Sequence, residues 1–161
     1  MQKTNVMRML DKAKITYTTA EYEVDESDLS GTHIAEVTGM NPETVFKTLV
    51  AKGDKTGHCV FCIPCAMEVD LKKAAKATGN KKVEFLPLKE LLPTTGYIRG
   101  GCSPIGMKKK FPTFIHESAK NFETISVSGG MRGLQVILSP VTLCDFVGGS
   151  FANLITEDKN D

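Results

Sequence analysis

The pattern of hydrophobic and polar positions changes its period several times along the chain. Apolar positions spaced as on one face of a helix predict a first helix, capped by Thr4, with Val6 and Leu10 on its buried side. Two apolar runs, 45–51 and 59–66, flank a polar stretch with two glycines, which predicts a β-hairpin. Further helices are expected over 32–38 (capped by Thr32 and ended by Gly39), 71–78 (capped by Asp70), 88–92 (ending before Pro93) and 141–147, and strands over 15–22, 98–99, 113–116, 124–128, 134–138 and 151–155.

These short elements follow one another without a repeat, a low-complexity tract or a linker in the 161 residues. We therefore predict a single compact domain over residues 1–161, of mixed α/β (α+β) class, with a mixed, mostly antiparallel curved sheet flanked by helices. No stretch approaches the roughly 20 apolar residues of a membrane helix, and the N-terminus lacks the apolar core of a signal peptide. We expect a cytoplasmic protein with no membrane partner.

Charge is distributed unevenly along the chain. Residues 21–45 hold seven acidic side chains and no Lys or Arg, whereas residues 72–132 hold twelve Lys or Arg and four acids. A local basic excess of this kind could attract a polyanion such as a nucleic acid, because neutralised phosphates release counterions. A charge run can equally be a solvated face, and charge alone does not separate the two interpretations.

Lys47 stands within an apolar strand pattern. Because side chains alternate along a strand, it shares a face with Val45 and Leu49, while Phe46 and Thr48 share the other. A lysine among apolar neighbours either extends to the edge of its sheet or meets an anion, since an unpaired buried ammonium is costly. The pattern leaves a structural and a ligand-binding lysine both open.

A glycine-rich loop spans residues 100–106, between the expected strand at 98–99 and three consecutive lysines. Glycines allow the backbone to approach a ligand closely, so that their amides could converge on an oxygen as in an oxyanion hole. The lysines beyond the loop are candidates for holding a phosphate backbone. The alternative is a plain turn with a solvated basic end.

A third candidate, the loop 126–133, also combines glycines with a cation, Arg132. It lacks both the phosphate-binding pattern of NTPases and the dinucleotide-binding pattern, so that neither fold is expected. A tight hairpin is the structural alternative.

Familiar nucleophilic and metal-binding patterns are weak in this sequence. No local motif ties any of the three histidines to a Ser or Cys. The spacing of Cys59, Cys62 and Cys65 suggests zinc, but on a strand it sends Cys62 to the opposite face from the other two, which suits packing. Five scattered cysteines fit reduced thiols. We expect no metal and no cofactor, and treat Cys102 as a bystander rather than a nucleophile.

Several blocks, in this order, resemble the YbaK/EbsC family of aminoacyl-tRNA deacylases, which is related to the editing domain inserted in bacterial prolyl-tRNA synthetases. The blocks are Asn41-Pro42, Val45–Val50, Asp70–Ala77, Lys81–Glu84, Thr95–Gly106 and Ser128–Leu134. The resemblance implies a cofactor-free hydrolase that cleaves the ester between an amino acid and the 3′ end of tRNA. Such a second, hydrolytic site is needed where side chains differ too little in binding energy.

In YbaK-like members the preferred substrate is cysteine on the proline tRNA, and the substrate's own thiol is thought to attack its ester. The resemblance then implies that Lys47 holds the terminal ribose or phosphate, while the amides of Gly100 and Gly101 line the carbonyl. It also implies a tRNA partner and, as a further candidate, prolyl-tRNA synthetase. The implied substrate-binding residues are Tyr22, Thr48, Cys102, Ser103, Pro104, Gly129 and Gly130, and the implied tRNA contacts are Lys108, Lys109, Lys110 and Arg132.

Three positions depart from some relatives. Some relatives have an aromatic residue where this chain has Ser30, an aspartate where it has Gln135, and an isoleucine where it has Cys102. These departures make the amino acid less certain than the reaction, and alanyl- or seryl-tRNA are alternatives. A noncatalytic module that binds tRNA or a synthetase is the main rival from another class, and a thiol or zinc protein is a weaker one.

Overall fold

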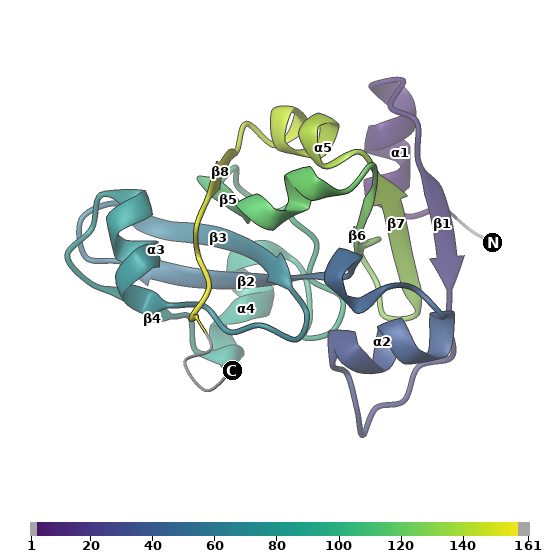
Figure 1. The fold of residues 1–161 in the computed structure, drawn as a ribbon, viewed down its shortest axis with the longest axis horizontal. Helices are drawn as coiled ribbons and strands as arrows, with labels where there is room; N and C mark the ends of the chain where they lie inside the picture. Colours follow the sequence, from purple (N-terminus) through teal and green to yellow (C-terminus); the bar gives the residue numbers. More distant parts are fainter. Residues whose placement is uncertain (1–2, 158–161) are drawn as a thin grey trace.

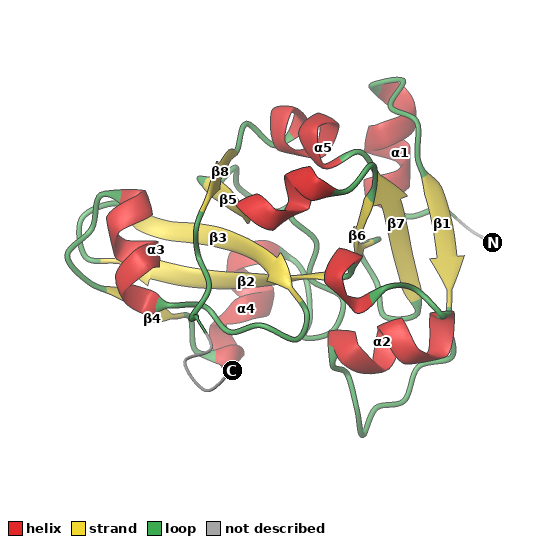
Figure 2. Ribbon diagram, in the orientation of Figure 1, coloured by secondary structure: helices red, strands yellow, loops and turns green. Residues whose placement is uncertain are grey.

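A computed structural model describes residues 3–157, with the eight strands arranged in two sheets (Figures 1 and 2). The mixed α/β class predicted from the sequence is confirmed. The elements are α1 (Asn5–Lys12), β1 (Thr18–Glu21), α2 (Gly31–Thr38), the 3-10 turn η1 (Pro42–Thr44), β2 (Phe46–Gly53), β3 (Gly57–Pro64), α3 (Leu71–Thr78), β4 (Val83–Phe85), α4 (Leu88–Thr95), β5 (Thr113–His116), η2 (Glu117–Asn121), β6 (Ile125–Ser128), β7 (Leu134–Leu138), α5 (Pro140–Phe146) and β8 (Ser150–Ala152).

Side-chain caps fix the starts of α1, α2, α3 and α5. Thr4 accepts from the Met7 amide and Asp70 from the amides of Lys72 and Lys73, as the sequence predicts. The predicted cap at Thr32 is wrong, because Ser30 takes that place and its hydroxyl accepts from the His33 amide. Ser30 has the extended backbone that a cap requires, whereas Thr32 already lies in the first turn.

The segment that precedes the glycine-rich loop also differs from expectation. Helix α4 continues through Pro93 to Thr95, because a proline in so short a helix removes a single internal hydrogen bond. Residues 98–99 form a turn rather than a strand, closed by the Gly101 amide, which donates to the Ile98 carbonyl at 3.0 Å. The loop therefore follows a helix and a turn. Strand β4, which the sequence pattern did not suggest, pairs with β2.

The strands divide between two sheets rather than forming the single sheet expected. A three-stranded sheet has the order β1-β7-β6 and is antiparallel throughout. A five-stranded sheet has the order β4-β2-β3-β5-β8, in which β3, β5 and β8 run parallel. A parallel bridge between Val45 and Ser126 connects the two sheets at the start of β2.

Each face of the five-stranded sheet is buried against a different part of the molecule. One face, with Phe46 and Val60, shares a core with Val127 and Val136 of the three-stranded sheet. The other face, with Phe61, packs against α3, which Figure 1 shows lying across β2 and β3. The start of β2 thus lies where the two sheets meet. No helix in the described part of the chain is long and apolar enough to cross a membrane.

Candidate active site

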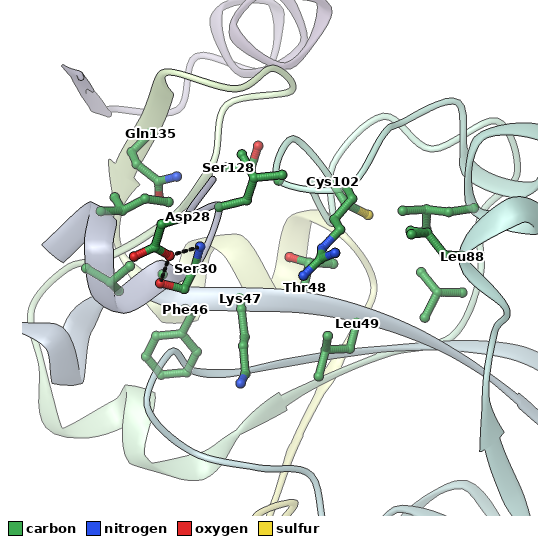
Figure 3. A pocket seen from close by; sticks show the side chains of 18 of the residues that line it. Asp28, Ser30, Phe46, Lys47, Thr48, Leu49, Leu88, Cys102, Ser128 and Gln135 are labelled. Atoms are coloured by element: carbon green, nitrogen blue, oxygen red, sulfur yellow. Dashed lines mark hydrogen bonds between the residues drawn. The ribbon is translucent and has the colours of Figure 1, made fainter. Parts of the chain in front are cut away.

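A pocket of about 500 Å³ lies at the junction of the two sheets. Its walls combine β2 and the end of β4 from the five-stranded sheet, the ends of β6 and β7, residues of α2 and α4, and connecting segments (Figure 3). The lining residues are Ser27–Gly31 and Ile34, Val45–Val50, Phe85, Leu86, Leu88, Leu91, Arg99, Gly100, Cys102, Ser128 and Gln135. The pocket therefore gathers segments that lie up to about a hundred positions apart in the sequence.

The edge of β2 that borders this pocket has a gap in its pairing. On the side away from β3, β4 pairs only with Ala51–Gly53, and the bridge to β6 involves only Val45. Between them, the Val50 carbonyl accepts from the Leu86 amide at 3.0 Å. Peptide groups alternate in direction along a strand, so those of Thr48 point to the same side as those of Val50. The main chain of Thr48 therefore faces the pocket without a strand partner in the described part of the chain.

Lys47 and Thr48 approach this open edge from opposite faces of the sheet. Lys47 pairs with Ile63 in the core beneath α3, and Thr48 pairs with Cys62 in the core shared by the two sheets. Figure 3 shows the Lys47 side chain pointing away from Thr48 and Cys102. The alternation expected from the sequence is confirmed. The edge of β2 thus places a cation on one face and a hydroxyl on the other.

The Lys47 ammonium is only loosely paired. Its Nζ lies 3.9 Å from Oε1 of Glu68, whose side chain is 82% exposed, while that of Lys47 is 27% exposed. An ion pair with so exposed a partner contributes little to stability, because water screens it. The lysine can therefore exchange Glu68 for another anion, such as a phosphate.

The glycine-rich loop borders the pocket through its first and third residues. Gly100 has φ +85°, a left-handed conformation that other residues rarely adopt, and a Cβ there would lie 3.4 Å from Cβ of Leu29. The Gly101 amide is engaged in the turn with Ile98, so the predicted use of that amide is corrected. Within residues 3–157 the amides of Gly100 and Cys102 have no acceptor. Both amides are therefore candidate donors to an oxyanion.

Cys102 is buried within this loop, and its thiol is poorly suited to nucleophilic attack. Burial raises the pKa of Cys102 to about 12, and the Thr95 hydroxyl offsets only part of that effect. At neutral pH a thiol with such a pKa is ionised in about one molecule in 10⁵. Its placement in the pocket wall agrees with a packing role.

Other predicted site residues lie in two neighbouring hollows. Tyr22 and Arg132 line a hollow of about 420 Å³, and Pro104, Lys109 and Lys110 line another of about 240 Å³. Arg132 connects the first hollow to the pocket, since its Nε donates to the Arg99 carbonyl at 2.8 Å. Lys108, Lys109 and Lys110 are all exposed, which leaves their predicted tRNA contacts sterically open.

Three further predicted residues serve the loops themselves. The buried Ser103 hydroxyl accepts from the Ile105 amide within the glycine-rich loop. Gly129 donates to the Leu134 carbonyl, and a Cβ there would lie 2.7 Å from Cγ of Leu134. Gly130 donates to the Ser128 hydroxyl at 3.1 Å. None of the three lines the main pocket.

Sequence reasoning did not select several residues of the pocket wall. In the sequence, Asp28 belongs to an acidic run and Arg99 to an expected strand, although the position of Arg99 next to Gly100 is a usable signal. Ser128 reaches the pocket from β6, and Gln135, noted in the sequence as a departure from some relatives, reaches it from β7. Leu86, Leu88 and Leu91 give it an apolar side. These residues come together only through tertiary structure.

No metal or histidine centre is evident in the described part of the chain. No group of three or more His, Cys, Asp or Glu side chains within residues 3–157 is placed to hold a metal ion. Cys59, Cys62 and Cys65 belong to three different buried clusters. His116 is buried outside the pocket, and its Nδ1 accepts from the Leu154 amide at 3.1 Å.

Comparisons with known proteins agree on one family. The model of the aminoacyl-tRNA editing domain matches residues 31–146. The chain is 51% identical to "Putative Cys-tRNA(Pro)/Cys-tRNA(Cys) deacylase EbsC" from Enterococcus faecalis, over 98% of this chain and 96% of that protein. It is 29% identical to "Uncharacterized protein YwhH" from Bacillus subtilis, over 77% and 78% of the two chains.

Solved structures show the same fold at low sequence identity. One is described as "a putative trans-editing enzyme for prolyl tRNA synthetase", with a TM-score of 0.80, 21% identity, and coverage of 97% of this chain and 100% of that one. Another, APE2540, has a TM-score of 0.86 at 17% identity, covering 95% and 100%. With a family model over most of its length and a relative at 51% identity, the chain belongs to the aminoacyl-tRNA editing domain family.

Proposed function

We propose that this protein deacylates mischarged tRNA in trans, with cysteine carried on the proline tRNA as its preferred substrate. The name of the 51% identical relative supports this substrate. The observation that carries the proposal is the arrangement at the open edge of β2. There the amides of Gly100 and Cys102, which have no acceptor within residues 3–157, share one pocket with the Thr48 main chain. Such a site can hold an ester and stabilise an oxyanion without a protein nucleophile.

The reaction follows from what the pocket provides. The substrate's thiol attacks its own ester carbonyl, and the loop amides stabilise the negative charge on the carbonyl oxygen. The bond to the 3′ oxygen of the terminal ribose then breaks, the thiol proton passes to that oxygen, and a cyclic thiolactone is released. The protein contributes position and electrostatics, and each well-aimed amide is worth about 3 kcal/mol in the transition state.

Cations around the pocket would hold the nucleic acid. Arg99 lines the pocket and Lys47 borders it, while the exposed Lys108, Lys109 and Lys110 follow the same loop in the sequence. Contacts of this kind are with phosphates, which makes them salt-dependent and independent of base sequence. A choice of the proline tRNA would then come from a partner, for which prolyl-tRNA synthetase is the natural candidate.

A deacylation assay tests this proposal. Proline tRNA is charged separately with cysteine, S-methylcysteine, alanine, serine and proline, and release of each amino acid is followed with time. We expect fast release of cysteine and slow release of S-methylcysteine, because methylation removes the attacking thiol. Equal rates for cysteine and S-methylcysteine would show that water, and not the substrate thiol, attacks the ester. Release of none of the five would leave a noncatalytic tRNA- or synthetase-binding module as the better interpretation.

A further inference from the structure

The pocket contains one carboxylate. Of the described residues that line it, only Asp28 is acidic, whereas Arg99 and Lys47 are basic. Gln135, its polar neighbour from β7, is neutral and uses Oε1 to accept from the Ser126 hydroxyl at 3.2 Å. A site for aminoacyl esters must also accommodate a cation, because the α-amino group of the amino acid is protonated at neutral pH.

We propose that Asp28 is the anchor for the α-ammonium group of the aminoacyl ester. This inference rests on the proposed function and adds a recognition element to it. The Asp28 side chain is half exposed, so an incoming ammonium gives up only part of its hydration, and the carboxylate replaces what is lost through charge-assisted hydrogen bonds. Because every aminoacyl-tRNA carries this ammonium, the anchor would position the ester without distinguishing the side chain.

The Asp28 carboxylate is held in place on one side only. Its Oδ1 accepts from the Ser30 hydroxyl at 2.6 Å and from the Ser30 amide at 3.1 Å. These hydrogen bonds lower the pKa of Asp28 below its usual value, so the group stays ionised at neutral pH. The other oxygen, Oδ2, lies 3.8 Å from Nδ1 of His33, beyond hydrogen-bond distance. Oδ2 is therefore available to an incoming ammonium.

The position of Asp28 in the chain also suits this role. The next residue, Leu29, lies against Gly100, with its Cβ 3.4 Å from where a Cβ of Gly100 would be. The segment that carries the carboxylate thus borders the loop that carries the oxyanion donors. In an aminoacyl ester a single carbon separates the ammonium from the carbonyl, so the two groups need binding partners from adjacent segments. Figure 3 shows Asp28 and Ser30 on the same side of the pocket as Gln135, with Leu88 on the other.

The chain offers a matched control three residues upstream. Asp25 accepts from the Ser27 amide at 2.9 Å and from the Ser27 hydroxyl at 2.6 Å, the same arrangement as Asp28 with Ser30. The pKa of Asp25 is lowered for the same reason: the Ser27 hydroxyl contributes most, followed by the Ser27 amide. Asp25 does not line the pocket. The two aspartates therefore share local structure and differ in what they face.

The experiment compares Asp28→Asn and Asp25→Asn with the unchanged protein. Each is assayed on cysteinyl-tRNA(Pro) and on its N-acetyl form, which lacks the ammonium. Asparagine keeps an acceptor for Ser30, so the turn is retained. We expect Asp28→Asn to lower kcat/KM for the free-amine substrate by about 10- to 100-fold, the range of a hydrogen bond to a charged group. The rate on the N-acetyl substrate should change by less than about twofold, and Asp25→Asn should leave both rates unchanged.

The other outcomes distinguish a failure of this inference from a failure of the proposed function. Equal losses on both substrates would show a structural role for Asp28, and no loss on either would remove it from the site; both overturn the inference while leaving the deacylase intact. If the unchanged protein cleaves neither substrate, the proposed function fails. A binding measurement then decides Asp28 separately, with uncleavable amide-linked cysteinyl-adenosine and its N-acetyl form as probes. Weaker binding of the free amine alone by Asp28→Asn supports the anchor, and equal binding of both probes by both proteins rejects it.

Discussion

The two ends of strand β2 are built in opposite ways. At the hairpin end, Lys52 and Gly53 have strand partners on both sides, and the Asn80 side chain accepts from the amides of Lys55 and Thr56 at 2.8 and 3.0 Å. At the other end, the edge at Thr48 has no strand partner in the described part of the chain and faces the pocket. One strand thus carries a closed and an open end.

This difference separates stability from recognition along a single element. A buried peptide group without a hydrogen-bond partner is costly. The closed end contributes to stability because its peptide groups have partners. The open end keeps donors and acceptors available, and an exposed strand edge is a general template for hydrogen bonding. We therefore expect substitutions at the open end to change activity and those at the closed end to change stability.

The largest effect should come from Gly100→Ala. Alanine is strained at φ +85°, and its Cβ would lie 3.3 Å from Nε of Arg132 and 3.4 Å from Cβ of Leu29, which displaces the oxyanion donors. We expect kcat to fall by about 100-fold or more, measured in single-turnover deacylation. Gly57→Ala is the matched control, because Gly57 has φ +76° and open space around it at the closed end. A similar loss of kcat in both variants would contradict a special role for Gly100.

Lys47→Ala should have the next largest effect. Removing the cation that borders the open edge should lower kcat/KM by about 10- to 100-fold and flatten its dependence on salt, because a phosphate contact is lost. Stability should change by less than about 0.5 kcal/mol, since the partner Glu68 is exposed. Lys52→Ala, on the same strand near the closed end, should change neither quantity. Unchanged activity in Lys47→Ala would remove the lysine from the site.

Asn80→Ala should act on stability alone. It leaves the amides of Lys55 and Thr56 without their acceptor, so we expect the free energy of unfolding in urea to fall by about 2 kcal/mol. The rate of deacylation by the folded fraction should stay the same. Asn80→Asp keeps the accepting oxygen and should lose less. A fall in kcat for Asn80→Ala at full folding would show that the two ends are coupled.

Cys102→Ser should have the smallest effect. With its pKa raised to about 12 by burial, the thiol does not supply a nucleophile at neutral pH, and serine keeps nearly the same shape. We expect kcat to stay within about threefold of the original, with an unchanged pH–rate profile between pH 6 and 8. An inactive but folded variant would reassign Cys102 as a nucleophile.

Local signals in the sequence predicted much of the fold. The caps at Thr4 and Asp70, the hairpin of β2 and β3, and strands β5 to β7 all follow from short patterns of side chains. The errors occurred where local signals compete, as at Ser30 and Thr32, or where a rule was applied too strictly, as at Pro93. The division into two sheets depends on long-range pairing that no local pattern encodes.

The site was predictable to a similar degree. The sequence points to Lys47, Thr48, Gly100 and Cys102, and all four line one pocket. Asp28 was missed because an acidic run on its own is typical of a solvated face, and only the contact of Leu29 with Gly100 places it at the site. The sequence predicted the Gly101 amide as an oxyanion donor, whereas the structure leaves the Cys102 amide available instead. The difference arises because hydrogen bonding in the turn is a property of the folded backbone.

The open edge of β2 has a consequence for how specificity can evolve. Substitution changes side chains and leaves the peptide groups of Thr48 in place, so recognition through that edge is insulated from mutation. The parts of the ester common to all amino acids can therefore be held while Gln135 and Leu88 vary around them. We expect exchanges at these two positions to move the enzyme between amino acids while leaving the hydrolytic machinery intact, which makes this pocket a practical scaffold for directed evolution of new editing activities.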